Sequence, residues 1–343
     1  MRTLRLTTSE QDIERAGEII RAGGRVAFPT ETVYGLGADA LNAEAVARIY
    51  AAKGRPSDNP MIVHIAAVSE LEPLVRDGFD GISEEALDIM KAFWPGPLTL
   101  VFPKSDAVPK ITTGGLDTVA IRMPSNETAQ AFIAAADRPI AAPSANISGK
   151  PSPTTYTDVL EDMNDRIEAV IMGEQCDVGI ESTVLDMTGE KPTILRPGII
   201  TAEWISAVTG IEVEYDKSLL EHHGDLADPG AGVADSEFAP KSPGMKYKHY
   251  APKAKVVIVD CSEEDFASRV LALGTMAKSE GMKVGILHYD NDARKAAHKL
   301  FADLREMDRA GYDVILVKAL EEEGLGFSVM NRMLKSAGYD VVK

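Results

Sequence analysis

Short apolar runs bounded by proline and glycine recur along the first two hundred residues and predict strands. The clearest runs are residues 26–28, 61–63, 98–102, 119–121 and 184–185. Runs of this length between turn residues are typical of strands rather than helices.

Two helical patterns lie between these runs. Residues 44–52 follow Asn42, a good N-cap, and stop at Gly54, a typical helix end. Residues 83–93 place Ala86, Met90 and Phe93 on one helical face. We therefore expect a mixed α/β domain with a twisted sheet over residues 1–212.

The pattern changes after residue 212. Residues 213–252 show no sustained apolar period and predict a linker. Beyond them, strand patterns at 255–259, 283–287 and 313–317 alternate with helical patterns at 263–279 and 293–311. This alternation predicts a small Rossmann-like parallel-sheet domain over residues 253–343.

The charge and composition narrow the function classes. With 36 basic against 53 acidic residues, the net charge of -17 argues against broad binding to nucleic-acid phosphates. No run of 18 apolar residues exists, and the first twenty residues lack signal-peptide features, so we expect a cytoplasmic protein. Cys176 and Cys261 are far apart and outside any C-x-x-C pair, which favours free thiols.

The stretch PTETVYGLGADA, residues 29–40, follows a predicted strand and is rich in hydrogen-bonding groups. Its Gly35–Ala40 portion fits a loose dinucleotide-binding pattern, but Thr30 to Tyr34 separate it from the strand, so the fit is poor. The alternatives are an ordinary polar turn or a binding loop, since loops that end strands commonly form sites.

Basic residues follow several predicted elements. Lys53 and Arg55 stand before a proline-rich loop that contains Asn59, an arrangement suited to a polyphosphate. Arg122 and Arg196 each follow a strand and together suggest a shared anion site. Taken singly, Lys53 and Arg55 could instead complement a helix dipole, and each later arginine could pair with a surface acid.

Other motifs limit the chemistry. Ser144 and Ser182 lie in turns without G-x-S-x-G, so no nucleophile elbow is indicated. P-loop, H-E-x-x-H and paired-cysteine zinc patterns are also absent. Residues 242–252, SPGMKYKHYAP, are basic and aromatic, which suggests either a lid over the first domain's site or a segment docked on one domain.

Eight of these segments, in order, resemble the YrdC/Sua5 family of threonylcarbamoyl-AMP synthases in its longer form, which carries a C-terminal domain. They are PTETVYGLG, KGRPSDNP, WPGPLT, VAIRMP, APSANISG, GIESTV, ILRPG and SPGMKYKHYAP. The stretch GLGFSVMNRMLKSA near the end is also similar to the longer form.

The resemblance implies a nucleotidyltransferase that joins L-threonine, bicarbonate or carbon dioxide, and ATP into threonylcarbamoyl-AMP and pyrophosphate. It implies Mg²⁺ as cofactor and a downstream tRNA threonylcarbamoyl transferase as partner, with tRNA binding weak or indirect and no membrane. Catalysis is expected at Lys53 and Arg55. The threonine residues would be Thr32, His64, Arg122, Ser144 and Ser182. The ATP residues would be Lys53, Arg55, Asn59, Thr118, Asn146, Thr154 and Arg196, with Tyr247, His249 and Tyr250 in the lid.

Several questions stay open at this level. Glu31, Glu181 or the nucleotide alone could hold the metal, and no general base is assigned. An RNA-binding module and a small-molecule sensor are rival functions. The role of the C-terminal domain, the oligomeric state and the order of substrate addition are not determined by the sequence.

Overall fold

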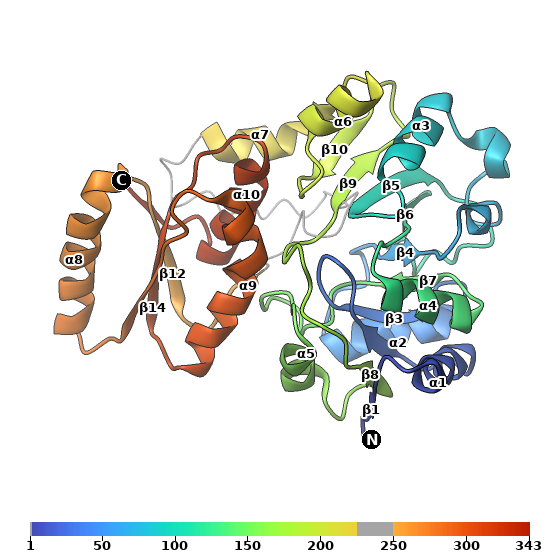
Figure 1. Ribbon diagram of the computed structural model, residues 1–343, viewed down its shortest axis with the longest axis horizontal. Coiled ribbons are helices and arrows are strands. Elements are labelled where there is room, and N and C mark those ends of the chain that lie inside the picture. The colour runs from blue at the N-terminus through green and yellow to red at the C-terminus, as the bar shows by residue number, and fades with distance from the viewer. Residues whose placement is uncertain (1, 225–249) are drawn as a thin grey trace.

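The structure is a computed structural model that describes residues 2–224 and 250–343. Two sheets with their helices lie on opposite sides of Figure 1. We call residues 2–224 the N-terminal unit and residues 250–343 the C-terminal unit. A mixed sheet in the first and an all-parallel sheet in the second confirm the predicted fold class.

The strands of the N-terminal unit form one large mixed sheet. They are β1 (Leu4–Leu6), β2 (Val26–Phe28), β3 (Gly35–Asp39), β4 (Ile62–His64), β5 (Leu98–Pro103), β6 (Thr118–Arg122), β7 (Ile140–Ala142), β8 (Ala169–Ile171), β9 (Thr183–Asp186), β10 (Thr193–Arg196) and β11 (Glu214–Tyr215). Within the described residues their order is β1-β8-β2-β3-β7-β4-β6-β5-β9-β10-β11.

Helices cover both faces of this sheet (Figure 1). They are α1 (Glu10–Arg21), α2 (Ala43–Lys53), α3 (Glu84–Phe93), α4 (Glu127–Ala136), α5 (Tyr156–Met163), α6 (Ala202–Thr209) and α7 (Lys217–Gly224), with the short 3-10 helices η1 (Val68–Leu71) and η2 (Gly78–Gly81). The Asn42 side chain caps α2, and Gly54 ends it in the left-handed conformation at φ 63, as the sequence predicts. Ser83 is the N-cap of α3, so that helix begins one residue later than expected.

The strand register determines which side chains meet at the edge of the large sheet. Parallel pairing of β4 with β6 puts His64 opposite Arg122. Both residues are the last of their strands, so their side chains lie at the same edge.

Gly35 and Gly37 of the stretch PTETVYGLGADA lie within a strand. Residues 35–39 form β3, antiparallel to β2, which excludes a dinucleotide-binding turn. A Cβ on Gly37 would lie 2.7 Å from the Ile140 side chain and 3.0 Å from the Phe28 ring. Glycine is therefore required here because the neighbouring side chains approach the backbone closely.

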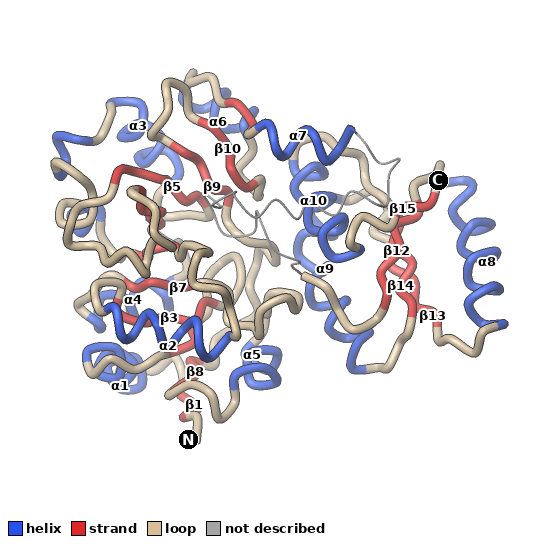
Figure 2. The backbone as a smooth tube through the Cα atoms, turned by 180° about the vertical axis from the view of Figure 1, so that it is seen from behind, coloured by secondary structure: helices blue, strands red, loops and turns tan. Residues whose placement is uncertain are grey.

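The C-terminal unit is a four-stranded parallel sheet in the order β13-β14-β12-β15. Its strands are β12 (Lys255–Val259), β13 (Val284–Leu287), β14 (Val314–Lys318) and β15 (Val341–Val342), and its helices are α8 (Glu263–Ser279), α9 (Ala293–Arg309) and α10 (Leu325–Ala337). One apolar core packs α8 against the sheet, and another packs α9 and α10 against its other face. In Figures 1 and 2, α9 and α10 lie between this sheet and the N-terminal unit.

Two sequence expectations need correction. Part of the stretch predicted as linker forms regular structure, because β11 pairs with β10 and α7 follows it. The helix α10 was not expected, since its N-cap, Gly324, provides no side-chain hydrogen bond to signal a helix start. The predicted domain boundaries themselves stay predictions.

Among the described helices, none combines the length and apolar character needed to cross a bilayer.

Candidate active site

A pocket lies where the ends of several strands of the large sheet converge. Its walls come from the loop after β2, from the last residues of β4, β6 and β10, and from the segments after β7 and before β9. Ten of the site residues expected from the sequence line it: Thr32, Lys53, Arg55, His64, Arg122, Ser144, Asn146, Ser182, Arg196 and Tyr250.

The other expected residues lie elsewhere. Asn59 and Thr154 are buried outside the pocket lining, and the buried atoms Asn59 Oδ1 and Thr154 Oγ1 have no hydrogen-bond partner. Thr118 is at the start of β6, at the opposite end from Arg122. Tyr247 and His249 are outside the described residues.

Arg122 is the centre of a buried polar cluster. Its Nη2 lies 2.7 Å from Glu31 Oε1, and its Nη1 donates to Thr32 Oγ1 at 2.9 Å. Burial raises the pKa of Glu31, but the Arg122 guanidinium outweighs burial, so this pKa lies below its ordinary value. The ion pair therefore stays charged, and buried Glu31 Oε2 and Arg122 Nη2 are left without a hydrogen bond of good geometry.

His64 lies beside Arg122 as a neutral base. Burial, followed by the charge of Arg122, lowers the pKa of His64 to about 3. Its Nδ1 is 3.2 Å from the Ile62 carbonyl oxygen, which can only accept, so a hydrogen bond at this position requires the tautomer with the proton on Nδ1. The Nε2 atom is then a hydrogen-bond acceptor.

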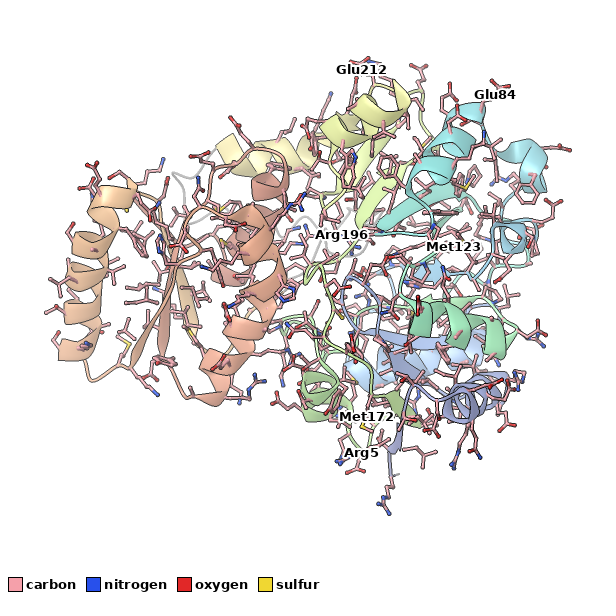
Figure 3. The ribbon with its side chains drawn as sticks, in the orientation of Figure 1. Arg5, Glu84, Met123, Met172, Arg196 and Glu212 are labelled. Atoms are coloured by element: carbon pink, nitrogen blue, oxygen red, sulfur yellow. The ribbon has the colours of Figure 1, made fainter. Side chains whose placement is uncertain are left out.

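Ser182 and Arg196 form the adjoining wall. Arg196 donates from Nε and Nη2 to the Ser182 carbonyl at 3.0 and 2.9 Å, and from Nη2 to Ser182 Oγ at 3.1 Å. The Ser182 hydroxyl also lies 2.8 Å from Thr99 Oγ1. In Figure 3, Arg196 lies on the side of the N-terminal unit that faces the C-terminal helices.

Lys53 ties the end of α2 to the loop after β7. Its Nζ donates to the carbonyls of Ser144 and Asn146 at 2.5 and 2.6 Å. Burial, and then the charge of Arg55, lowers the pKa of Lys53 well below its usual value. In this structure Lys53 holds the loop as well as lining the pocket.

Arg55 contacts one of the three predicted ATP residues that lie outside the lining, Asn59. Its Nη2 donates to the carbonyls of Asn59 and Pro60 at 3.4 and 3.1 Å. Arg55 and Asn59 thus lie together within the loop that follows α2.

Sequence reasoning missed part of the pocket. Thr30, Ser148, Lys150 and Ser152 also line it, as does Glu181, which the sequence named only as a possible metal ligand. Ser152 follows the serine-rich stretch 144–149 and could have been noticed there, because its type and spacing continue that pattern. Its hydroxyl donates to Glu181 Oε1 at 2.6 Å.

Tyr250 is the described part of the predicted lid, and it contributes to the pocket wall. Its ring stacks on Phe301 of α9 with centroids 5.1 Å apart. The next residue, Ala251, donates its N–H to the Gly149 carbonyl at 2.8 Å. The pocket is therefore bordered by both units.

The arrangement suits an anionic ligand next to a small polar one. Positive side chains Arg55, Arg122 and Arg196 face the pocket in a chain whose net charge is -17. Cysteine is absent from the lining, and burial raises the pKa of Cys176, so this thiol stays protonated.

Comparison with known proteins gives the family. A family model described as "Telomere recombination" (Sua5, YciO and YrdC) matches residues 18–198, and one described as "Threonylcarbamoyl-AMP synthase, C-terminal domain" matches residues 200–338. Threonylcarbamoyl-AMP synthase of Pyrococcus abyssi is 48% identical over 97% of this chain and 96% of its own length. The Bacillus subtilis protein of the same name is 43% identical over 98% and 96%.

The solved structures agree with the sequence matches. The structure of Pyrococcus abyssi Sua5 complexed with L-threonine superposes with a TM-score of 0.89 at 46% identity, covering 100% of this chain and 99% of the other. Because both family models and full-length relatives match, the chain belongs to the Sua5/YrdC family, in the long form that carries the Sua5 C-terminal domain.

Proposed function

We propose that this chain is a nucleotidyltransferase that makes threonylcarbamoyl-AMP and pyrophosphate from L-threonine, bicarbonate or carbon dioxide, and ATP. Relatives named threonylcarbamoyl-AMP synthase that match 95–98% of the chain support this reaction. The structural observation that carries the proposal is a single pocket in which the Arg122 cluster adjoins Lys53, Arg55 and Arg196.

The proposed chemistry needs positioning more than covalent catalysis. The neutral threonine amine attacks the carbon of carbon dioxide and releases one proton, or the carbon of bicarbonate with loss of water, and the new C–N bond makes a carbamate. A carbamate oxygen then attacks the α-phosphorus of ATP. The bond from that phosphorus to the bridging oxygen breaks, and pyrophosphate leaves. Negative charge grows on phosphoryl oxygens, so preorganised guanidinium groups are the expected stabilisers.

In this proposal threonine binds at the Arg122 cluster. Its carboxylate faces Arg122 Nη2, which lacks a well-aligned acceptor in the structure. The neutral His64 accepts a hydrogen bond from the substrate through Nε2, and the hydroxyls of Thr32, Ser144 and Ser182 complete a small polar site. The Pyrococcus abyssi relative solved with L-threonine supports this class of ligand.

ATP binds along the other side of the pocket. Arg55 and Arg196 contact its phosphates as guanidinium forks, and Lys53 and Asn146 form the wall between the two substrates. Asn59, Thr118 and Thr154 are assigned to ATP in this proposal although they lie outside the pocket lining, and the buried atoms Asn59 Oδ1 and Thr154 Oγ1 are without a hydrogen-bond partner. Tyr250 borders the same side.

Magnesium is proposed to arrive with the nucleotide. No group of three or more His, Cys, Asp or Glu side chains within residues 2–224 and 250–343 is placed to hold a metal ion. Glu31 and Glu181 are each paired with an arginine. A magnesium ion bound mainly by phosphates and water fits these residues, and we assign it no protein ligand.

The product is a reactive mixed anhydride, so it must be passed on quickly. We propose that it supplies the threonylcarbamoyl group for the tRNA adenosine beside the anticodon, through a separate transferase in the cytoplasm. The acidic surface supports an indirect role for tRNA rather than tight binding to this chain.

Pyrophosphate release tests the proposal directly. ATP with magnesium is incubated with L-threonine and bicarbonate, singly and together, and release is expected only when both are present. Arg55→Ala should lower kcat/KM for ATP by about 100-fold while the urea midpoint changes little. Arg138→Ala, a surface change outside the pocket, is the control. Release that is indifferent to threonine would disprove the proposed reaction.

A further inference from the structure

One wall of the pocket is held from outside the N-terminal unit. The loop formed by residues 146–152 contributes Asn146, Lys150 and Ser152 to the lining. Side chains from α9 and α10 of the C-terminal unit bond to this loop or to the carboxylates that hold it.

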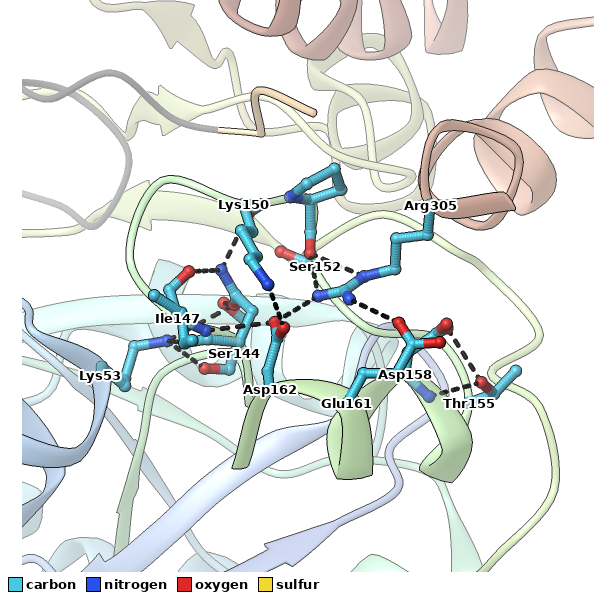
Figure 4. Close-up of polar contacts among 12 residues, drawn as sticks. Lys53, Ser144, Ile147, Lys150, Ser152, Thr155, Asp158, Glu161, Asp162 and Arg305 are labelled. Atoms are coloured by element: carbon cyan, nitrogen blue, oxygen red, sulfur yellow. Dashed lines mark hydrogen bonds and ion pairs between the residues drawn. The ribbon is translucent and has the colours of Figure 1, made fainter. Parts of the chain in front are cut away.

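Arg305 on α9 holds the loop through a backbone carbonyl. Its Nε and Nη2 donate to the Pro151 oxygen at 3.1 and 2.7 Å, and Nη2 also donates to Asp162 Oδ2 at 2.8 Å. Asp162 in turn accepts from Lys150 Nζ at 2.6 Å and from the Ile147 N–H at 3.3 Å. Figure 4 shows this chain of contacts from Arg305 to the pocket loop.

Arg332 on α10 holds the next residue through Glu181. Its Nε donates to Glu181 Oε2 at 3.2 Å, while Glu181 Oε1 accepts from the Ser152 hydroxyl. Burial raises the pKa of Glu181, but Arg332, followed by Arg196, outweighs burial and keeps the carboxylate charged. Pro151 is therefore held directly by α9, and Ser152 is held by α10 through Glu181.

Both arginines are buried, at 5% exposed for Arg305 and 0% for Arg332. A buried guanidinium loses its hydrogen bonds to water, which lowers the stability of the folded chain unless protein groups replace them. Arg332 Nη2 has no such replacement partner. Replacement of such a pair by apolar residues is often neutral or stabilising, so stability alone is a weak reason to place two arginines here.

Arg309, one turn beyond Arg305, makes a different kind of contact. It is 45% exposed at the side chain and pairs with Asp158 and Glu161 on α5. These contacts attach α9 to the N-terminal unit but do not reach the pocket loop. A substitution at Arg309 is therefore a matched control, because it weakens the contact between the two units without removing a bond to the pocket loop.

We propose that Arg305 and Arg332 are positioning residues that set loop 146–152 for the nucleotide. The C-terminal unit is then part of the nucleotide half of the active site, and neither arginine bonds to a residue proposed for threonine. This inference rests on the proposed function, because it assigns the loop to ATP.

Lysine substitutions in the full chain test the inference. Arg305→Lys and Arg332→Lys keep a cation beside each buried carboxylate but remove the guanidinium fork. Each should raise the KM for ATP by about tenfold, which corresponds to about 1.4 kcal/mol, and leave the KM for threonine within about twofold. Arg309→Met, although more severe, should change neither KM.

Direct titration with MgATP, together with thermal unfolding of each variant, separates the possible outcomes. Weaker MgATP binding in the two lysine variants alone supports the inference. Normal binding in both, equal changes in the two KM values, or the same loss in Arg309→Met would overturn it. A wild-type protein that binds MgATP but releases no pyrophosphate with threonine contradicts the proposed function, while the binding comparison still decides the inference.

Discussion

The two halves of the pocket are built in different ways. The Arg122 cluster is formed by the last residues of neighbouring strands and the loop after β2, all within the N-terminal unit. Another wall, loop 146–152, is bonded directly to α9 and, through Glu181, to α10 of the C-terminal unit. The half proposed for threonine is therefore fixed by a sheet register, whereas the half proposed for the nucleotide depends on how the two units meet.

The largest expected effect comes from breaking the sheet-based half. Arg122→Met leaves the buried Glu31 carboxylate unpaired, so the free energy of unfolding should fall by about 3–5 kcal/mol and threonine-dependent turnover should be lost. Urea unfolding and pyrophosphate release measure the two effects. Adding Glu31→Gln should restore much of the stability but no activity, and a single variant as stable as wild type would contradict this account.

A pH dependence further characterises the same half. The pKa of His64 is about 3 in the folded chain, below its ordinary value of 6.5, so the unfolded chain takes up the proton first as pH falls. The stability contribution is thus complete at neutral pH and decreases below about pH 6.5. Between about pH 7 and pH 4.5, wild type should lose about 1–3 kcal/mol more than His64→Gln. If the free energies of unfolding of the two proteins, measured with urea, change with pH by the same amount, that result would argue against a buried, neutral His64.

The smallest effect is expected in the nucleotide half. Ser152→Ala removes one hydrogen bond to Glu181 and should cost about 1 kcal/mol of unfolding free energy, with a few-fold rise in the KM for ATP. Ser148→Ala, in the same loop but without a side-chain bond to a carboxylate, should leave the unfolding free energy unchanged. Equal losses in both variants would remove the reason to single out the bond from Ser152 to Glu181.

Most of the secondary structure near the pocket followed from local sequence. The Asn42 cap and the Gly54 end of α2 are confirmed, as are the strands that carry His64 and Arg122. These features depend on neighbours within a few residues, which is the range over which capping and strand patterns act. The helix α10 was missed because its start at Gly324 has no polar cap.

The family resemblance also pointed to ten residues that line the pocket, but Ser152 was not among them, and Glu181 was named only as a possible metal ligand. A glutamate and a serine in turns are ordinary surface residues in most sequences. In the folded chain both side chains are buried and bonded to each other, and Arg332 of α10 pairs with the Glu181 carboxylate.

The sequence by itself determined the strands and helices, the acidic net charge and the types of side chain that end the strands of the large sheet. The tertiary structure alone decided that Arg305 holds the pocket loop at Pro151 and that Arg332 pairs with Glu181 of the pocket lining. Arg305 is 154 residues from the carbonyl it holds, and Arg332 is 151 residues from Glu181. An arginine on an amphipathic helix has the same sequence pattern whether it is solvated or buried, because its partner is set by the packing of the two units.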